Sequence, residues 1–476
     1  MSEPSLLLPQ AITAIPAFLL WLSMALSIGI SLAYACAHTI TFLTQDIKWQ
    51  TITAWTRSLL KWLLMGALGN LCLLAIPLAV NWLPFWKITP ILSSLSILIP
   101  EIILVLTTIL LAIRVWKGEK RMTPRAHLTT VWLLSLFVGL SLWIPVAVMA
   151  WMEYPQESWI SFQDLSIVAS HPWYIVFSAL GILKFCLLIT SSWVIGGGFL
   201  LIACLRNPCE KELAKRSAII AISMVLIGGV LTLCIGDSTG YSIAGNQPMK
   251  MAAIQQLEKG QRKAPLVIAG PIQIPELLSR LATHSNNGFV PGMSDIINGE
   301  YTTANDTPAH SFYQKRTKAS QAFYARRKDS TNISATWDMG KRYWGYLYLS
   351  CPEEGVPNTF PLFVAFRLMV GGGFLLLLFA TIQIAGWIRT EIQERIWFKY
   401  AGTAIMPLAL FCSLCGWYIS LYGMHPWAIT ELLAVSSAIS SLPLWVLGVE
   451  FLLVVGGCIL WTIFIGKQLK SIIVPS

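Results

Sequence analysis

Nine long apolar runs, each close to the length of a membrane span, dominate this chain of 476 residues. They lie at about 12–36, 59–80, 91–113, 128–151, 172–203, 218–235, 362–386, 401–421 and 445–466. A helix needs about 20 apolar residues to cross the roughly 30 Å hydrocarbon core of a membrane. Charged residues make up only 12% of the sequence, about half of their usual share in a soluble protein. The sequence therefore predicts an all-α integral membrane protein with about nine transmembrane helices.

The positions of lysine and arginine predict how these helices are oriented. Short cytoplasmic loops carry an excess of both residues. With the N-terminus placed outside, the inner loops and the C-terminal tail hold about half of the 33 basic residues. The short outer loops hold only Lys87. We therefore expect an outer N-terminus and a cytoplasmic C-terminus. The net charge of +10 follows mostly from this inner-face excess, and no nucleic-acid partner is expected.

One region between the sixth and seventh apolar runs is soluble in character. Residues 237–361 are rich in Gly, Asn, Ser, Thr and Lys and contain no long apolar run. The chain is therefore divided into helices one to six in 1–236, an extracytoplasmic domain in 237–361, and helices seven to nine in 362–476.

Three short helices are predicted within this outer domain. The segments 249–259 and 274–283 have an amphipathic pattern, and the second begins at Pro275 and Glu276. The segment 311–328 is basic and contains four aromatic residues. The sequence leaves open whether this basic segment is a solvated face over the membrane or a contact with another subunit.

A few ionisable residues lie within the apolar runs. They are Glu101, Lys184 and Arg367, with Glu450 at the start of the ninth run. Ionisable groups are costly inside a membrane and are functional candidates for that reason. Arg367 has an alternative explanation, because a long cation near a helix end can extend to the lipid headgroups.

Several short motifs follow one another in an order that resembles subunit I of the cytochrome bd-type quinol oxidases. They are Gly236–Tyr241, Asn246–Ile254, Phe366–Val370, Gly416–Tyr418 and Tyr422–Trp427. The resemblance implies nine helices with a long outer loop between the sixth and seventh, in agreement with the hydropathy pattern. It also implies haem, quinol and a second membrane subunit as the molecules that the family binds.

The resemblance implies a quinol-binding loop that begins after Asp237. Lys250 matches a lysine that the family places in this loop. The family has a glutamate five residues later as proton acceptor, and here that position is Gln255. A carboxamide can hold a quinone but cannot take up a proton. Glu258, nearly one helical turn further on, is the candidate to replace it.

The resemblance also implies three haems, but the expected iron ligands are mostly missing. Met369 matches the methionine ligand of a low-spin haem b, with Arg367 and Trp417 beside it. The histidine that should face it on span five falls at Lys184. Thioether and imidazole are strong axial donors for haem iron, whereas an ammonium must first lose its proton. At most one haem b site, with Met369 as metal ligand, is therefore expected.

Three functional hypotheses follow. The first is a haem-depleted partner subunit of a quinol-linked respiratory complex in a bacterial or archaeal cytoplasmic membrane. It would contact lipids and pair with a second bd-type subunit or a haem-bearing homologue. The second is a divergent catalytic quinol:oxygen oxidoreductase, in which Lys184 joins Met369 and the oxygen site uses Glu101, His425 or His38. The third is a membrane scaffold or transporter without a redox role.

Overall fold

The protein is described by a computed structural model that covers residues 3–90, 95–118, 121–155, 160–163, 166–169, 172–206, 211–303, 307–327, 340–388 and 395–473. Within these ranges, nine segments are helical, long and apolar enough to cross a membrane, which confirms the predicted fold class. They contain α1 (Glu3–Thr44), α2 (Ile47–Val80), α4 (Leu95–Gly118), α5 (Pro124–Leu140) followed by α6 (Trp143–Glu153), α8 (Ala179–Arg206), α9 (Lys211–Asn246), α15 (Thr359–Ile388), α17 (Ile396–Tyr422) and α19 (Leu444–Ile473).

The sequence explains where several of these helices begin. Asp46 caps α2, since its carboxylate accepts a hydrogen bond of 2.8 Å from the backbone N–H of Lys48. Thr123 caps α5, where Pro124 occupies the first helical position. The sixth span is longer than its apolar run, because α9 continues past the expected boundary at 236 and ends at Asn246.

The core of the bundle lies where α1, α2, α8 and α9 meet, and much of it is completely buried. The helices α1 and α8 come into backbone contact at Gly29 and Gly196. A Cβ added to Gly29 would lie 2.6 Å from the Cα of Gly196, and the reverse distance would be 2.5 Å. Glycine is therefore required at this crossing, because any side chain would separate the two helices.

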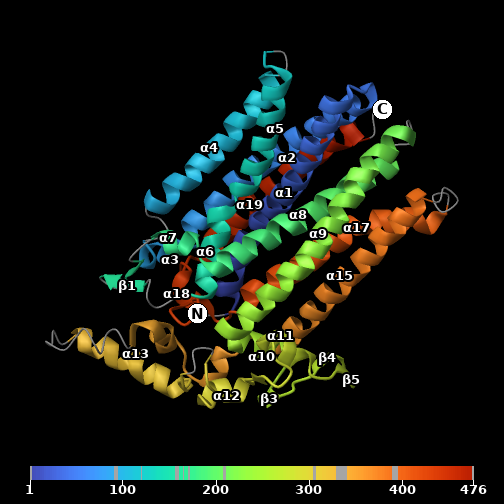
Figure 1. The fold of residues 1–476 in the computed structure, drawn as a ribbon. Helices are drawn as coiled ribbons and strands as arrows, with labels where there is room; N and C mark the ends of the chain where they lie inside the picture. Colours follow the sequence, from blue (N-terminus) through green and yellow to red (C-terminus); the bar gives the residue numbers. More distant parts are fainter. Residues whose placement is uncertain are drawn as a thin grey trace.

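We use the name outer domain for the described residues of 237–361, after the side of the membrane that the sequence predicts. The outer domain lies at the end of the bundle that also holds the N-terminus, and the C-terminus lies at the opposite end (Figure 1). Its three predicted helices are present as α10 (Pro248–Gln255), α11 (Leu277–Thr283) and α13 (Phe312–Arg327). It also contains β3 (Gln261–Arg262), β4 (Leu266–Ala269), β5 (Ile272–Ile274), β6 (Phe289–Val290), α12 (Met293–Asn298), η2 (Lys341–Tyr348) and η3 (Pro352–Gly355). The short antiparallel pairs β3–β6 and β4–β5 were not anticipated from the sequence.

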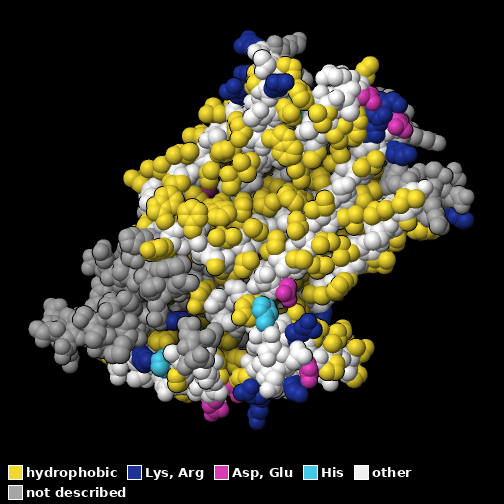
Figure 2. Space-filling view, in the orientation of Figure 1, with side chains coloured by type: hydrophobic (Ala, Val, Ile, Leu, Met, Phe, Trp, Pro, Cys, Tyr) yellow, Lys and Arg dark blue, Asp and Glu magenta, His cyan; other side chains and the backbone are white. Residues whose placement is uncertain are grey.

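The loops at this end of the bundle contain further short elements. They are α3 (Leu83–Ile88), β1 (Ile160–Gln163), β2 (Ser166–Ala169), α7 (Pro172–Val176), β7 (Trp427–Ile429), β8 (Leu433–Ala434) and α18 (Val435–Ala438). On the face shown in Figure 2, hydrophobic side chains cover the length of the bundle, whereas lysine and arginine gather near its two ends. This distribution is typical of a protein surrounded by lipid.

Candidate functional site

A buried carboxylate at the outer end of the bundle joins two lysines from distant parts of the chain. Glu153 is the last residue of α6 and is only 1% exposed. Lys184 of α8 forms an ion pair with its Oε1 atom. Lys250 of α10 forms a second ion pair, with 2.8 Å between Nζ and Oε2. The lysine that matches the quinol-loop motif and the lysine at the expected histidine position therefore share one carboxylate.

Ser420 of α17 also belongs to this group, and we call Glu153, Lys184, Lys250 and Ser420 the Glu153 cluster. Lys184 Nζ donates to Ser420 Oγ at 2.8 Å, and Ser420 Oγ in turn donates to Glu153 Oε1. Lys250 Nζ donates to the backbone carbonyl of Ser420 at 3.1 Å. The cluster thus connects α6, α8, α10 and α17, and it attaches the start of the outer domain to three spans.

The Glu153 cluster contains more positive than negative groups. Lys250 is 2% exposed, and burial lowers its pKa to about 8, although the carboxylate of Glu153 opposes this shift and Lys184 adds to it. Ion pairs between one carboxylate and two ammonium groups offset the cost of burying these charges only while their hydrogen bonds are also formed. The ammonium of Lys250 is therefore committed to Glu153 and Ser420 and is closed to solvent.

Arg367 of α15 forms a second polar junction beside this cluster. Its guanidinium donates to Val267 O at 3.0 and 2.6 Å, to Ile254 O at 2.7 Å and to Gln255 Oε1 at 2.8 Å. It also lies 3.5 Å from the ring centre of Phe363. The structure therefore brings Arg367 and Gln255 together, and the arginine holds the end of α10 and strand β4 against the seventh span.

The two acidic candidates of the quinol loop lie apart from these junctions. The helix α10 ends at Gln255, because Gln256 adopts a left-handed conformation with φ 53°. The expected helical turn that would place Glu258 beside Gln255 is therefore absent. The side chain of Glu258 is exposed, and its backbone carbonyl accepts a hydrogen bond from Ser294 N at 3.0 Å. Asp237 is exposed on α9.

Met369 lies where α15 packs against α17. It contacts an apolar cluster that includes Ile254, Cys415 and Ile419. Its Sδ atom would be 3.3 Å from a Cβ added to Gly416, so the thioether occupies the space that this glycine leaves. Trp417 is the next residue of α17 and is half-buried.

The residues proposed as alternative ligands of an oxygen site do not come together. His38 lies near the end of α1 far from the outer domain, and its Nε2 is 2.9 Å from Nδ1 of His127. His425 is exposed in the turn after α17, at the outer end. Glu101 is half-buried on α4. Among the described residues, no group of three or more His, Cys, Asp or Glu is placed to hold a metal ion.

The donors near Met369 do not fit a haem with two axial ligands. The ammonium of Lys184 is bonded to Glu153 and Ser420, and a protonated amine has no lone pair for iron. The helix α8 contains no histidine that could replace it. Among the described residues packed around Met369, the sulfur groups are its own thioether and the thiol of Cys415, and there is no imidazole.

A second carboxylate, which is half-buried, holds the far part of the outer domain. Glu431, in the loop between β7 and β8, lies 2.5 Å from Nζ of Lys315 and 3.5 Å from Nε of Arg342. It also accepts one hydrogen bond of 2.9 Å from the hydroxyl of Tyr346. Burial opposes ionisation of Glu431, but the two cations and the hydrogen bonds outweigh this effect and lower its pKa to about 2. The basic helix α13 therefore uses Lys315 for a contact within this chain.

The sequence did not identify Glu153, Ser420 or Glu431 as site residues. One signal was available for Glu153, since a lysine within a span requires a counterion and Glu153 is an acid at the end of a neighbouring span. Nothing local to Ser420 or Glu431 indicates a partner, because their contacts come from segments far away in the sequence.

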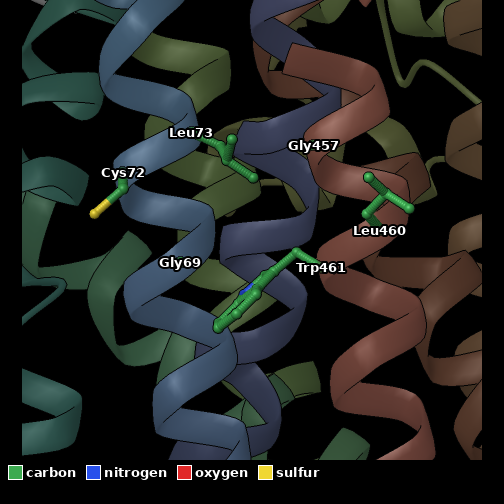
Figure 3. Close-up of a pocket in the computed structure, with 6 residues that line it drawn as sticks. All are labelled: Gly69, Cys72, Leu73, Gly457, Leu460 and Trp461. Carbon is green, nitrogen blue, oxygen red and sulfur yellow. The ribbon is translucent and has the colours of Figure 1, made fainter. Parts of the chain in front are cut away.

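A shallow groove between α2 and α19 is separate from both clusters (Figure 3). Its volume is about 380 Å³. It is lined by Gly69, Cys72, Leu73, Gly457, Leu460 and Trp461. These residues lie within the spans and, apart from the free thiol of Cys72, they offer no group for acid–base or redox chemistry.

Comparison with known proteins agrees with this architecture. The model of the family described as cytochrome bd terminal oxidase subunit I matches residues 8–472. Cytochrome bd-II ubiquinol oxidase subunit 1 of Escherichia coli is 28% identical over 374 residues, which are 73% of this chain and 72% of that protein. Cytochrome bd ubiquinol oxidase subunit 1 of Bacillus subtilis is 21% identical over 351 residues, which are 68% of this chain and 62% of that protein.

A solved structure shares the fold. The bd oxidase from Geobacillus thermodenitrificans contains a chain that matches with a TM-score of 0.78 and 16% identity over 98% of both chains. Together with the nine spans and the match of the family model over nearly the whole sequence, this shows that the protein belongs to the cytochrome bd terminal oxidase subunit I family, as a multi-pass protein of the bacterial inner membrane.

Proposed function

We propose that this chain is a haem-poor partner subunit of a quinol-linked, bd-type respiratory complex. The observation that carries the proposal is the state of Lys184. This residue stands where the resemblance expects an iron-binding histidine, and its Nζ is bonded to Glu153 and Ser420. An amine held as the cation of an ion pair does not bind iron, so electron transfer would use haems of a partner subunit.

The retained quinol loop suggests what the chain contributes. Lys250 and Arg367 fix α10 to the bundle through Glu153, Ser420 and the backbone of the loop. In this proposal the loop is the scaffold of a quinol site at the outer membrane face. The carboxylate beside Lys250 belongs to Glu153, and Gln255 cannot act as proton acceptor.

Haem content tests the first part of the proposal. The purified full chain would be examined by pyridine haemochrome assay and by reduced-minus-oxidised spectra, alone and after co-expression with its neighbouring bd-type genes. We expect a haem-to-protein ratio near zero for the chain alone and haem absorbance only in the assembled complex. Two or more haems per isolated chain would reject a haem-poor subunit.

Binding of a quinol analogue tests the second part. In the assembled complex, Lys250→Ala should weaken binding of the analogue, because α10 loses its ionic attachment to Glu153. Lys259→Ala is the matched control, since Lys259 is an exposed lysine of the same loop. Equal binding by both variants and the unmodified protein would remove the quinol role of this loop.

A further inference from the structure

Another buried acid lies at the junction of α2 and α19, away from the Glu153 cluster. Glu450 of α19 is 7% exposed, and Asn81, which directly follows α2, is 0% exposed. The Nδ2 group of Asn81 donates to Glu450 Oε1 at 3.1 Å. One carboxyl oxygen of Glu450 therefore has a hydrogen-bond donor, the NH2 group of Asn81.

Within the described ranges, the second oxygen of the Glu450 carboxyl and the amide oxygen of Asn81 lack hydrogen-bond partners. Among the residues that the structure describes, Glu450 Oε2 and Asn81 Oδ1 are both buried and have no hydrogen-bond partner. The nearby hydroxyl of Ser440 does not serve them, since it donates to Val80 O at 3.0 Å. An ionised carboxylate and an amide carbonyl only accept hydrogen bonds, so these two oxygens could not satisfy each other.

The surroundings of Glu450 do not supply a positive charge. An apolar cluster that includes Ile12, Leu19 and Leu73 packs against α19 on this side of the bundle. The ion pairs found in the described part of the chain include none to Glu450, and Lys87, on the neighbouring α3, is exposed. A buried carboxylate without a cation is strongly disfavoured, and such a group is normally found neutral.

We propose that Glu450 and Asn81 form a proton-binding site in which Glu450 is a neutral carboxylic acid. The acid and the amide are complementary, because each then donates one hydrogen bond and accepts one. The Oε2–H group of Glu450 donates to Asn81 Oδ1, while Asn81 Nδ2 donates to Glu450 Oε1. The proton comes from water and returns to water when the site is emptied, and no electron transfer is involved. A single proton thereby provides the donor that both unpartnered oxygens lack.

Infrared spectroscopy of the purified full chain in H₂O and D₂O tests this site. A protonated carboxyl has a carbonyl band that is distinct from the bands of a carboxylate and that shifts in D₂O. Glu450→Gln should remove one such band, and Asn81→Leu should shift it, because the carboxyl loses its amide partner. Glu101→Gln is the matched control, since it removes another partly buried acid and should leave the Glu450 band unchanged.

A second readout separates the proton site from general damage to the fold. Glutamine keeps the shape and neutral charge of a protonated glutamate, so Glu450→Gln should keep the melting temperature of the unmodified protein. Glu450→Ala, which removes both hydrogen bonds, should lower it. If Glu450→Gln removes a carboxylate band in place of the protonated one, Glu450 is ionised and the proposal is wrong. This result does not depend on the haem content or on quinol binding.

Discussion

Two carboxylates, one buried and one half-buried, attach the outer domain to the membrane bundle in different surroundings. Glu153 lies at the end of a span, is 1% exposed, and pairs with lysines of α8 and α10. Glu431 lies in a loop, has an 18% exposed side chain, and pairs with Lys315. Water can replace part of the contacts of Glu431 and very few of those of Glu153. Removal of the carboxylate charge should therefore reduce the stability of the protein far more at Glu153 than at Glu431.

The largest effect is expected at Glu153. Glu153→Gln keeps the size of the side chain but leaves two buried ammonium groups without a counterion. Breaking a buried charge pair in this way costs about 3–5 kcal/mol. We therefore expect a much lower melting temperature in detergent, together with faster proteolysis of the loop after α10.

Two further variants sharpen this test. Glu212→Gln is the control, because Glu212 pairs with Arg216 at 3.2 Å but its side chain is 49% exposed. The triple variant Glu153→Leu/Lys184→Met/Lys250→Met should recover most of the lost stability, since replacing a whole buried charge cluster by apolar residues is often neutral. An unchanged melting temperature of Glu153→Gln would contradict the importance of the cluster.

A smaller, local effect is expected at Glu431. Glu431→Gln removes the charge that holds Lys315 and Arg342, and hydrogen bonds to charged groups contribute about 1.5–3 kcal/mol. Since water reaches this site, we expect a local loss near the low end of that range. Hydrogen exchange should become faster in α13 and η2 and stay unchanged in α8. Exposed Glu258→Gln should leave both regions as they are.

The ionisation of Glu431 also predicts how the attachment of α13 to the bundle depends on pH. Glu431 has its pKa lowered from 4.5 to about 2 in the folded protein. A group with a lowered pKa binds fewer protons when folded, so its contribution is fully present above pH 4.5 and is lost as the pH falls towards 2. Protection of α13 from hydrogen exchange should decrease across this window. Protection that stays constant from neutral pH down to pH 2 would show that Glu431 does not hold α13.

The smallest effect is expected for an exposed ion pair at the other end of the bundle. Arg216 lies 2.6 Å from Asp46, with side chains 23% and 35% exposed. Screening by water leaves solvent-exposed pairs with little net contribution to stability. Arg216→Gln should therefore change the melting temperature only slightly, and high salt should reduce even this difference. If Arg216→Gln lowers the melting temperature as much as Glu153→Gln, solvent exposure does not determine how much these ion pairs contribute to stability.

The fold was largely predictable, because its signals are local. The apolar runs indicated the nine spans of the described residues, amphipathic patterns indicated α10 and α11, and a basic segment with aromatic residues indicated α13. Lys184 and Arg367 were identified as costly charges within spans. Their partners were not, since Glu153 is 31 residues from Lys184 and the carbonyl of Val267 is 100 residues from Arg367. Such pairing is decided by how helices pack, which a single sequence does not encode locally.

One local expectation failed for a local reason. Glu258 was expected to lie a helical turn beyond Gln255, but Gln256 turns the chain into a left-handed conformation and ends α10. The strand pairs β3–β6 and β4–β5 were missed because they are too short to show an alternating pattern. The division of the chain at residue 237 stays a proposal, although α9 itself continues to Asn246.

The hydrogen bonds of Arg367 restrict which side chains can replace arginine at this position. One flat guanidinium reaches Val267, Ile254 and Gln255 at the same time. A lysine carries the same charge, but its three N–H groups radiate from one nitrogen and lack the flat, wide fork with which the guanidinium reaches these oxygens. Exchange of arginine for lysine here would keep the positive charge. It would still break hydrogen bonds between α15 and the β4–β5 hairpin, because the shape of the donor group changes.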